Sequence, residues 1–153
     1  MLAGVMAIAI VAAGCGSGSD GSTDTTVVVL TKTEFIKQGD AICAKGSETL
    51  SKEAEEFAEA NNIDTSKPTK EQQEEVVTTV VAPALQTQAD ELGELGAPKG
   101  EEEKTTAIID ALEAGAEELE DNPGALLESS GAGPLDKANE LAKEFGFKSC
   151  GQE

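Results

Sequence analysis

The chain contains no histidine, arginine, tyrosine or tryptophan, and all 11 of its basic residues are lysine. Without histidine, it lacks the side chain that proteins use most often as a general base and as a metal ligand. Without arginine, it has no planar guanidinium group for the bidentate binding of phosphates or carboxylates. These absences argue against catalysis and against a metal centre.

The short motifs of catalytic and cofactor sites are missing as well. The sequence has no C-x-x-C pair, no G-x-S-x-G element around a nucleophilic serine and no glycine-rich phosphate loop. Pairs of carboxylates carry no signal for acid–base catalysis, because 30 acidic residues always supply some pair. We therefore expect a noncatalytic protein with no catalytic residues, no cofactor and no metal site.

Positive charge is scarce, since 30 acidic residues face 11 lysines and the formal net charge is -19 at pH 7. The phosphates of a nucleic acid would meet a negative surface, and few aromatic side chains are present to stack on bases. We therefore expect no nucleic-acid partner. The acidic runs 101–103 and 117–121 contain no D-x-[DN]-x-[DN]-G calcium loop, so solvated helix faces are expected there, with weak nonspecific cation binding as the alternative.

The first 14 residues are typical of a lipoprotein signal peptide. Residues 2–13 are apolar or small, and a run of about a dozen fits a signal segment better than a membrane-spanning helix of about 20 residues. The stretch "AAGC" that ends at Cys15 resembles a bacterial lipobox, where signal peptidase II cuts and the cysteine is lipidated. The resemblance implies cleavage after Gly14 and a lipid on Cys15. An ordinary secretory signal or a short buried segment is the alternative.

The residues after Cys15 are expected to form a flexible tether over 15–31. The stretch "GSGSDGSTDTT" has no apolar residue, a composition typical of disorder. About 17 such residues give a root-mean-square reach of roughly 20–25 Å. Residues 26–30, "TVVVL", are expected to be extended chain that packs loosely on the domain. Together these features predict a protein held by its lipid on the extracytoplasmic face of the cell membrane.

Three cysteines are present, and the lipobox interpretation uses one of them. Cys43 and Cys150 remain, and export to an oxidising compartment allows them to form one disulfide. In the chain-entropy model, closing a loop of about 100 residues stabilises a fold by roughly 4.7 kcal/mol. Two free thiols or an intermolecular bond are the alternatives.

Residues 32–153 are expected to form one all-α domain that resembles a four-helix bundle. Apolar periodicity and turn residues predict helices over about 32–61, 69–95, 101–121 and 134–145. The predicted inward-facing residues are Phe35, Ile42, Leu50, Phe57, Val77, Val81, Leu85, Gln88, Leu92, Leu95, Ile108, Ile109, Leu112, Ala116, Leu119, Leu135, Ala138, Leu141, Ala142 and Phe145. Leu126 and Leu127 are also expected to be tucked in.

Capping residues and glycines refine these helices. Thr31 or Thr33 is expected to cap the first helix, and "TKEQ" from Thr69 resembles a capping box for the second. Pro134 suits the first position of the last helix, and Gly146 suits its C-cap. In the first helix, Gly39 and Gly46 are expected to allow a close approach or a bend.

Pro83 lies inside the second predicted helix, where a proline costs about 3 kcal/mol and kinks or breaks the helix. We predict a kinked helix, with a strand over the β-branched run at 76–82 as the alternative. A kinked helix can open a bundle and leave a pocket for a small apolar or cationic ligand. Packing that accommodates the kink is the other outcome.

Two segments carry a resemblance beyond the lipobox, namely "FIKQGDAICAKG" at 35–46 and "ANELAKEFGFKSCG" at 138–151. Together they resemble small uncharacterised lipoproteins of actinobacteria. That resemblance supports the location and the disulfide, and it implies no activity. We expect a noncatalytic binding or interaction module with an unknown protein partner. The alternative is a lipoprotein that binds a small ligand or a cation and serves a membrane partner.

Overall fold

The computed structural model describes residues 29–128 and 133–151 of the chain, and within these ranges the fold is all-α as predicted. The predicted signal peptide at 1–14, the lipid on Cys15 and the tether up to residue 28 lie outside the described residues. The elements are α1 (Lys32–Ala60), α2 (Lys70–Val76), the π-helical segment η1 (Val77–Val81), α3 (Ala82–Glu94), α4 (Glu102–Asp121), α5 (Gly124–Leu127) and α6 (Asp136–Phe145).

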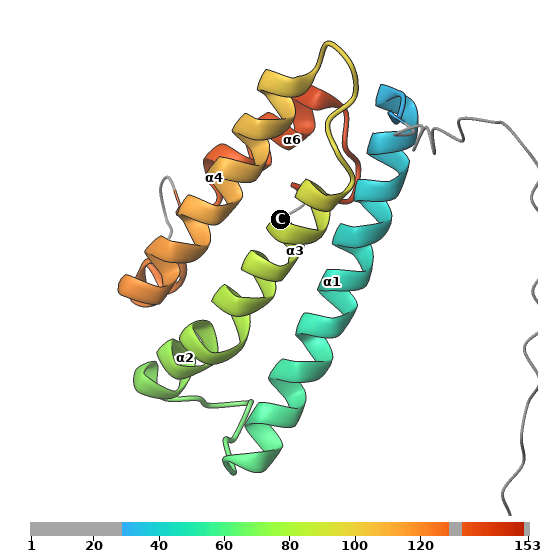
Figure 1. Ribbon diagram of the computed structural model, residues 1–153. Helices are drawn as coiled ribbons and strands as arrows, with labels where there is room; N and C mark the ends of the chain where they lie inside the picture. The colour runs from blue at the N-terminus through green and yellow to red at the C-terminus, as the bar shows by residue number, and fades with distance from the viewer. Residues whose placement is uncertain (1–28, 129–132, 152–153) are drawn as a thin grey trace, which may run out of the picture.

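The longer helices lie alongside one another in an order that brings both ends of the domain together. In Figure 1, α3 lies beside α1 on one side and beside α4 on the other, and α6 lies against α4. The segment after α6 then returns toward α1. None of the helices in the described ranges is both long enough and apolar enough to cross a membrane.

Reciprocal capping boxes begin the first two predicted helices. The Glu34 N–H donates to Thr31 Oγ1 at 3.3 Å, and the Thr31 N–H donates to Glu34 Oε2 at 2.9 Å. Thr69 and Gln72 form the same pair of bonds at 3.2 and 2.9 Å. Each box satisfies two groups at a helix end, where the first N–H donors lack helical partners. The structure therefore selects Thr31 over Thr33 and confirms Thr69.

The π-helical segment η1 lies just before Pro83, within the helix that was predicted to be kinked. The Ala82 N–H donates to the Val77 carbonyl, five residues back, and Pro83 follows at the start of α3 without an N–H to donate. A wider turn of this kind interrupts the i to i−4 ladder next to the proline. The β-branched run at 76–82 is therefore helical and does not form a strand.

The end of the chain departs from the prediction at two places. Helix α6 begins at Asp136 and not at Pro134, because Asp136 Oδ2 accepts the Gly133 N–H at 2.8 Å and holds a turn before the helix. Leu127 is 40% exposed, since the single turn of α5 points adjacent residues in different directions and only Leu126 packs inward. Gly146 caps α6 with a φ of 114°, as expected of a C-cap glycine.

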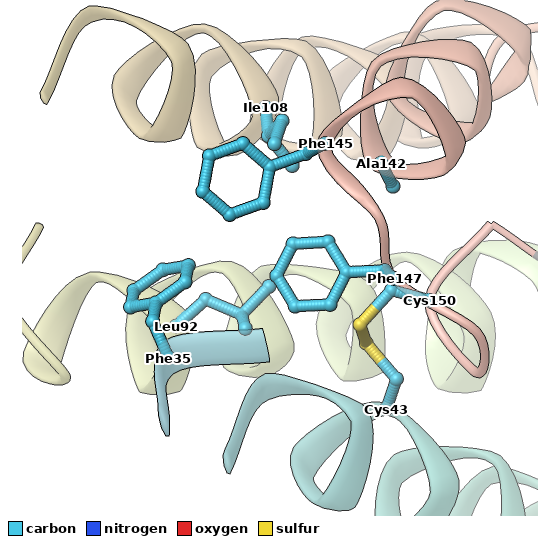
Figure 2. Packing of buried hydrophobic residues seen from close by; sticks show 8 residues of the cluster. All are labelled: Phe35, Cys43, Leu92, Ile108, Ala142, Phe145, Phe147 and Cys150. Atoms are coloured by element: carbon cyan, nitrogen blue, oxygen red, sulfur yellow. A yellow bond between two sulfur atoms is a disulfide. The ribbon is translucent and has the colours of Figure 1, made fainter. Parts of the chain in front are cut away.

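The main core lies where α1, α3, α4 and α6 meet. Phe35, Phe145 and Phe147 contact one another there, with ring centroids 5.5–5.9 Å apart (Figure 2). A second cluster of Val77, Ala82 and Leu119 lies further along α3 and α4. The predicted core residues Ile42, Leu50 and Phe57 are only partly buried. Of the segment 26–30, Val29 and Leu30 are described, and Leu30 packs against the main core.

Candidate functional site

Two of the three cysteines meet in the structure. The sulfur atoms of Cys43 on α1 and Cys150 after α6 lie 2.02 Å apart, at the bonding distance of a disulfide (Figure 2). Both residues are buried, and 107 positions separate them in the sequence. The bond fastens the C-terminal segment to the first helix. Cys15 lies outside the described residues.

Two neighbours of Cys43 on α1 hold the same segment. The Asp40 carboxylate accepts the backbone N–H groups of Lys148 at 2.8 Å and Ser149 at 2.6 Å. Gly39 leaves room for Phe147, because a Cβ at position 39 would lie 2.5 Å from a ring carbon of that residue. We call residues 146–151 the C-terminal clasp. The expected close approach at Gly39 is therefore confirmed.

A cavity of about 520 Å³ lies beside the clasp, between α1, α3, α4 and α6. This volume is within the range of small-molecule sites in proteins, about 300–1,000 Å³. Its wall combines aliphatic side chains and the disulfide with polar groups, and polar atoms supply slightly more than half of its accessible surface. The aliphatic part comprises Leu50, Leu85, Leu92, Ile108, Leu112, Leu126, Leu135, Ala138 and Ala142.

Gln88 is the buried polar side chain of this wall. It is 8% exposed, and none of the described residues forms a hydrogen bond with its side-chain amide. Gly46 on α1 lies directly against it, because a Cβ at position 46 would be 2.5 Å from the Gln88 amide carbon. The glycine thus makes space for an amide that retains both its donor and its acceptor capacity beside the cavity.

Other polar groups lie around the cavity. The Ser47 hydroxyl donates to the Cys43 carbonyl at 3.0 Å, and the Asn139 side chain also lines the wall. Asp136 is the ionisable residue among the described residues that line the cavity, and no lysine or aromatic residue occurs among them. The cavity therefore offers apolar surface and neutral hydrogen-bonding groups.

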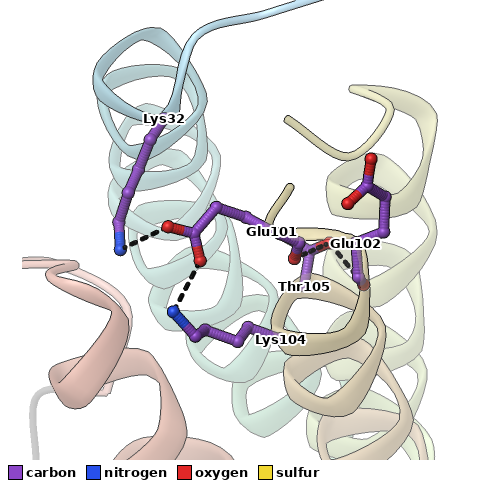
Figure 3. Close-up of polar contacts among 5 residues, drawn as sticks. All are labelled: Lys32, Glu101, Glu102, Lys104 and Thr105. Atoms are coloured by element: carbon purple, nitrogen blue, oxygen red, sulfur yellow. Dashed lines mark hydrogen bonds and ion pairs between the residues drawn. The ribbon is translucent and has the colours of Figure 1, made fainter. Parts of the chain in front are cut away.

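The acidic runs do not assemble a metal site within the described ranges. No group of three or more carboxylate or thiol side chains there is placed to hold an ion. Glu101 instead pairs with lysines: its carboxylate lies 2.8 Å from Lys104 Nζ and 3.3 Å from Lys32 Nζ (Figure 3). The hydrogen bond from Lys104, with a further one from Lys32, holds the pKa of Glu101 below its ordinary value of 4.5.

Lys32 joins this ion pair to the core. Its Nζ lies 4.2 Å from the centroid of the Phe145 ring, over a face that attracts cations. The cluster of Lys32, Glu101 and Lys104 therefore connects α1, the start of α4 and α6. Its charged groups pair with one another, so we infer that the cluster stabilises the fold and is not a binding site.

Gln88 was predicted to face inward, but no function was predicted for it. The pattern that could have indicated one is a single amide on a helix face whose other predicted residues are leucine and valine. Ser47 and Asn139 gave no signal, because polar residues at a helix surface are ordinary. No known protein family, curated protein or solved structure matches this chain, and its function is inferred from its own residues.

Proposed function

We propose that this protein is a noncatalytic, lipid-anchored binding protein whose helical domain holds a small molecule in the cavity beside the C-terminal clasp. The observation that carries the proposal is that cavity of about 520 Å³, with the largely buried Gln88 side chain in its wall. Ligand pockets usually combine apolar side chains with polar groups that fix the orientation of the ligand, and this cavity contains both.

The second candidate is a module that binds another protein. Such a module would bury an exposed apolar patch on its partner. Among the described residues, Val29 and Leu127 are the large hydrophobic side chains that are well exposed; Val29 precedes α1 and Leu127 ends α5. The cavity therefore favours a small-molecule ligand over a protein partner.

The anchoring half of the proposal is supported by the sequence around Cys15. The apolar run at 2–13, the "AAGC" stretch and the polar residues that follow fit a lipidated cysteine on a tether. Two or three acyl chains would hold the protein firmly at the extracytoplasmic surface, whereas one gives marginal binding.

Fractionation of cells that express the Cys15→Ser variant tests the anchor. We expect the variant to leave the membrane fraction or to stay unprocessed, because it offers no thiol for the lipid. The wild-type protein should be found with the membranes at the mass of residues 15–153 plus lipid. Processed Cys15→Ser protein that remains in the membrane fraction would refute the lipid anchor.

Native mass spectrometry of protein extracted in mild detergent tests the ligand. Ser47 and Ser51 form a matched pair on α1, since each is exposed and each hydroxyl bonds the carbonyl four residues back, but only Ser47 lines the cavity. We expect a bound small-molecule mass in wild type and in Ser51→Trp, and its loss in Ser47→Trp, whose indole fills the opening. A protein without added mass in all three forms contradicts the proposed function.

A further inference from the structure

The chemistry of the cavity wall narrows the class of ligand, and this step rests on the proposed function. Leucine from α1, α3 and α4 and isoleucine from α4 supply the apolar part of the wall, and polar atoms supply slightly more than half of its accessible surface. Burying apolar surface stabilises a complex, and buried polar groups need hydrogen-bond partners. The ligand therefore has both an apolar part and hydrogen-bonding groups.

The charge around the cavity argues against an anion. Asp136 supplies the ionisable group of the described lining residues, and the whole chain carries a formal net charge of -19. With no lysine in that part of the wall, an anionic group would enter a negative field without a counterion. Moving an unpaired charge out of water into such a site is costly.

The same wall is also poorly suited to a cation. Asp136 is exposed, and its carboxylate already accepts the Gly133 N–H at 2.8 Å. Cation-binding pockets commonly use aromatic faces, and the described part of this wall contains none. A buried cation would therefore lack both a desolvated carboxylate and an aromatic cage.

Gln88 supplies the specific polar contact. Its amide is buried against Gly46 and has no hydrogen bond to another described residue. An amide both donates and accepts, so it satisfies a hydroxyl, a carbonyl, an amide or an amine N–H on a neutral guest. No fully buried side-chain nitrogen or oxygen among the described residues lacks a partner, so the unpaired atoms of this amide are accessible from the cavity and a guest can reach them.

We infer that the cavity binds an uncharged amphipathic molecule, and that the Gln88 side-chain amide recognises a hydrogen-bonding group on it. The ligand is thus a neutral amphipathic compound, and carboxylates, sulfonates, phosphates and ammonium compounds are poor ligands. A small apolar or cationic ligand was one hypothesis from the sequence, and this assignment chooses an uncharged ligand.

A matched pair of fluorescent dyes tests the assignment. N-phenyl-1-naphthylamine is uncharged and has one N–H donor, whereas 8-anilino-1-naphthalenesulfonate has the same aromatic body with an added sulfonate. Both dyes are titrated into the full chain carrying Cys15→Ser, so that no lipid phase takes up the dye. Binding at the cavity is the fluorescence increase that the Ser51→Trp variant retains and the Ser47→Trp variant loses.

We expect the neutral dye to bind at the cavity at least ten times more tightly than the sulfonate. The substitution Gln88→Met keeps the size of the side chain and removes the amide. It should lower the affinity for the neutral dye by about 3–10-fold, which corresponds to the loss of one neutral hydrogen bond. Circular dichroism confirms that each variant is folded.

The outcomes separate the two proposals. Equal or tighter binding of the sulfonate at the cavity overturns the neutral class and leaves a ligand-binding protein. Neutral-dye binding that Gln88→Met does not weaken overturns the role of the amide. No cavity-dependent signal from either dye, when native mass spectrometry does show a ligand, also overturns the neutral class. Absence of a ligand mass from native mass spectrometry overturns the proposed function itself.

Discussion

Gly39 faces the edge of the Phe147 ring across less space than a methyl group needs. A Cβ there would lie 2.5 Å from the ring and 3.0 Å from a Leu92 methyl carbon, and both neighbours are packed in the core. Gly39→Ala should therefore destabilise the domain by about 1–2 kcal/mol, because the strain of overpacking exceeds the gain in helix propensity. Urea unfolding followed by circular dichroism measures this difference.

Gly93 on α3 is the control for that substitution. It is helical and exposed, and a Cβ there would meet no described atom within 4 Å. Gly93→Ala should stabilise the domain by about 0.5–1 kcal/mol, because alanine loses less conformational freedom in a helix. Opposite signs for the two variants support the contact at Gly39, and stabilisation by both would refute it.

Glu101 makes a pH-dependent contribution to stability. Its pKa in the fold lies below the ordinary 4.5, chiefly because Lys104 donates to its carboxylate. A lowered carboxyl pKa stabilises the folded state above the unfolded pKa, and this stabilisation is lost as the pH falls through the folded value. Wild type should therefore be more stable than Glu101→Gln at pH 7, and the difference should shrink progressively as the pH falls below about 4.5.

Urea titrations at pH 7, 4.5 and 3 measure this effect. Glu113→Gln serves as the comparison, since Glu113 is exposed and forms no ion pair with another described residue. The Glu113→Gln variant should be at least as stable as wild type at pH 7, because removing one acid from a chain of net charge -19 relieves repulsion. A constant advantage of wild type over Glu101→Gln at all three pH values would be inconsistent with the ion pair.

At the scale of the helices, the disulfide attaches the C-terminal clasp covalently to α1. It closes a loop of 107 positions, for which the chain-entropy model gives about 4.7 kcal/mol. Reduction should lower the melting temperature by several degrees. The double variant Cys43→Ala/Cys150→Ala should melt near the reduced wild type and should not respond to reductant. Identical melting of oxidised and fully reduced wild type would exclude a stabilising bond.

Most helix ends were predictable from local chemistry. The capping boxes at Thr31 and Thr69 and the glycine at 146 act within a few residues, so the sequence displays them directly. The start of α6 was not predictable, because Pro134 fits a first helical position and the Gly133–Asp136 turn competes for it. The π-helical turn before Pro83 depends on how the neighbouring helices pack, which a local pattern does not contain.

The cavity could not be predicted from the sequence. The proline allowed either a pocket or packing that fills the space, and the outcome depends on which side chains meet there. Leu50 matched the apolar period and was expected in the core, whereas it lines the cavity and is only partly buried. The close approach of Gln88 to Gly46 joins residues 42 positions apart on different helices. Only the folded arrangement of α1 and α3 brings them together.

At the scale of the whole molecule, the net charge of -19 opposes compaction. Salt screens this repulsion, with a Debye length of about 10 Å at 0.1 M. The melting temperature should therefore rise moderately between 20 and about 500 mM NaCl.

Calcium and magnesium chloride at matched ionic strength should have similar effects on the melting temperature, since the described residues contain no ready-made ion site. A large, saturable and calcium-selective rise would contradict this expectation.

The link between Cys43 and Cys150 also turns the chain between these residues into a covalent ring. The exposed connection at 61–67 between α1 and α2 lies inside the ring. A protease that cuts one peptide bond there leaves α3, α4 and α6 joined through sulfur to α1. Shedding of these helices from the N-terminal part of the chain therefore requires two events, either a second cut or reduction of the bond.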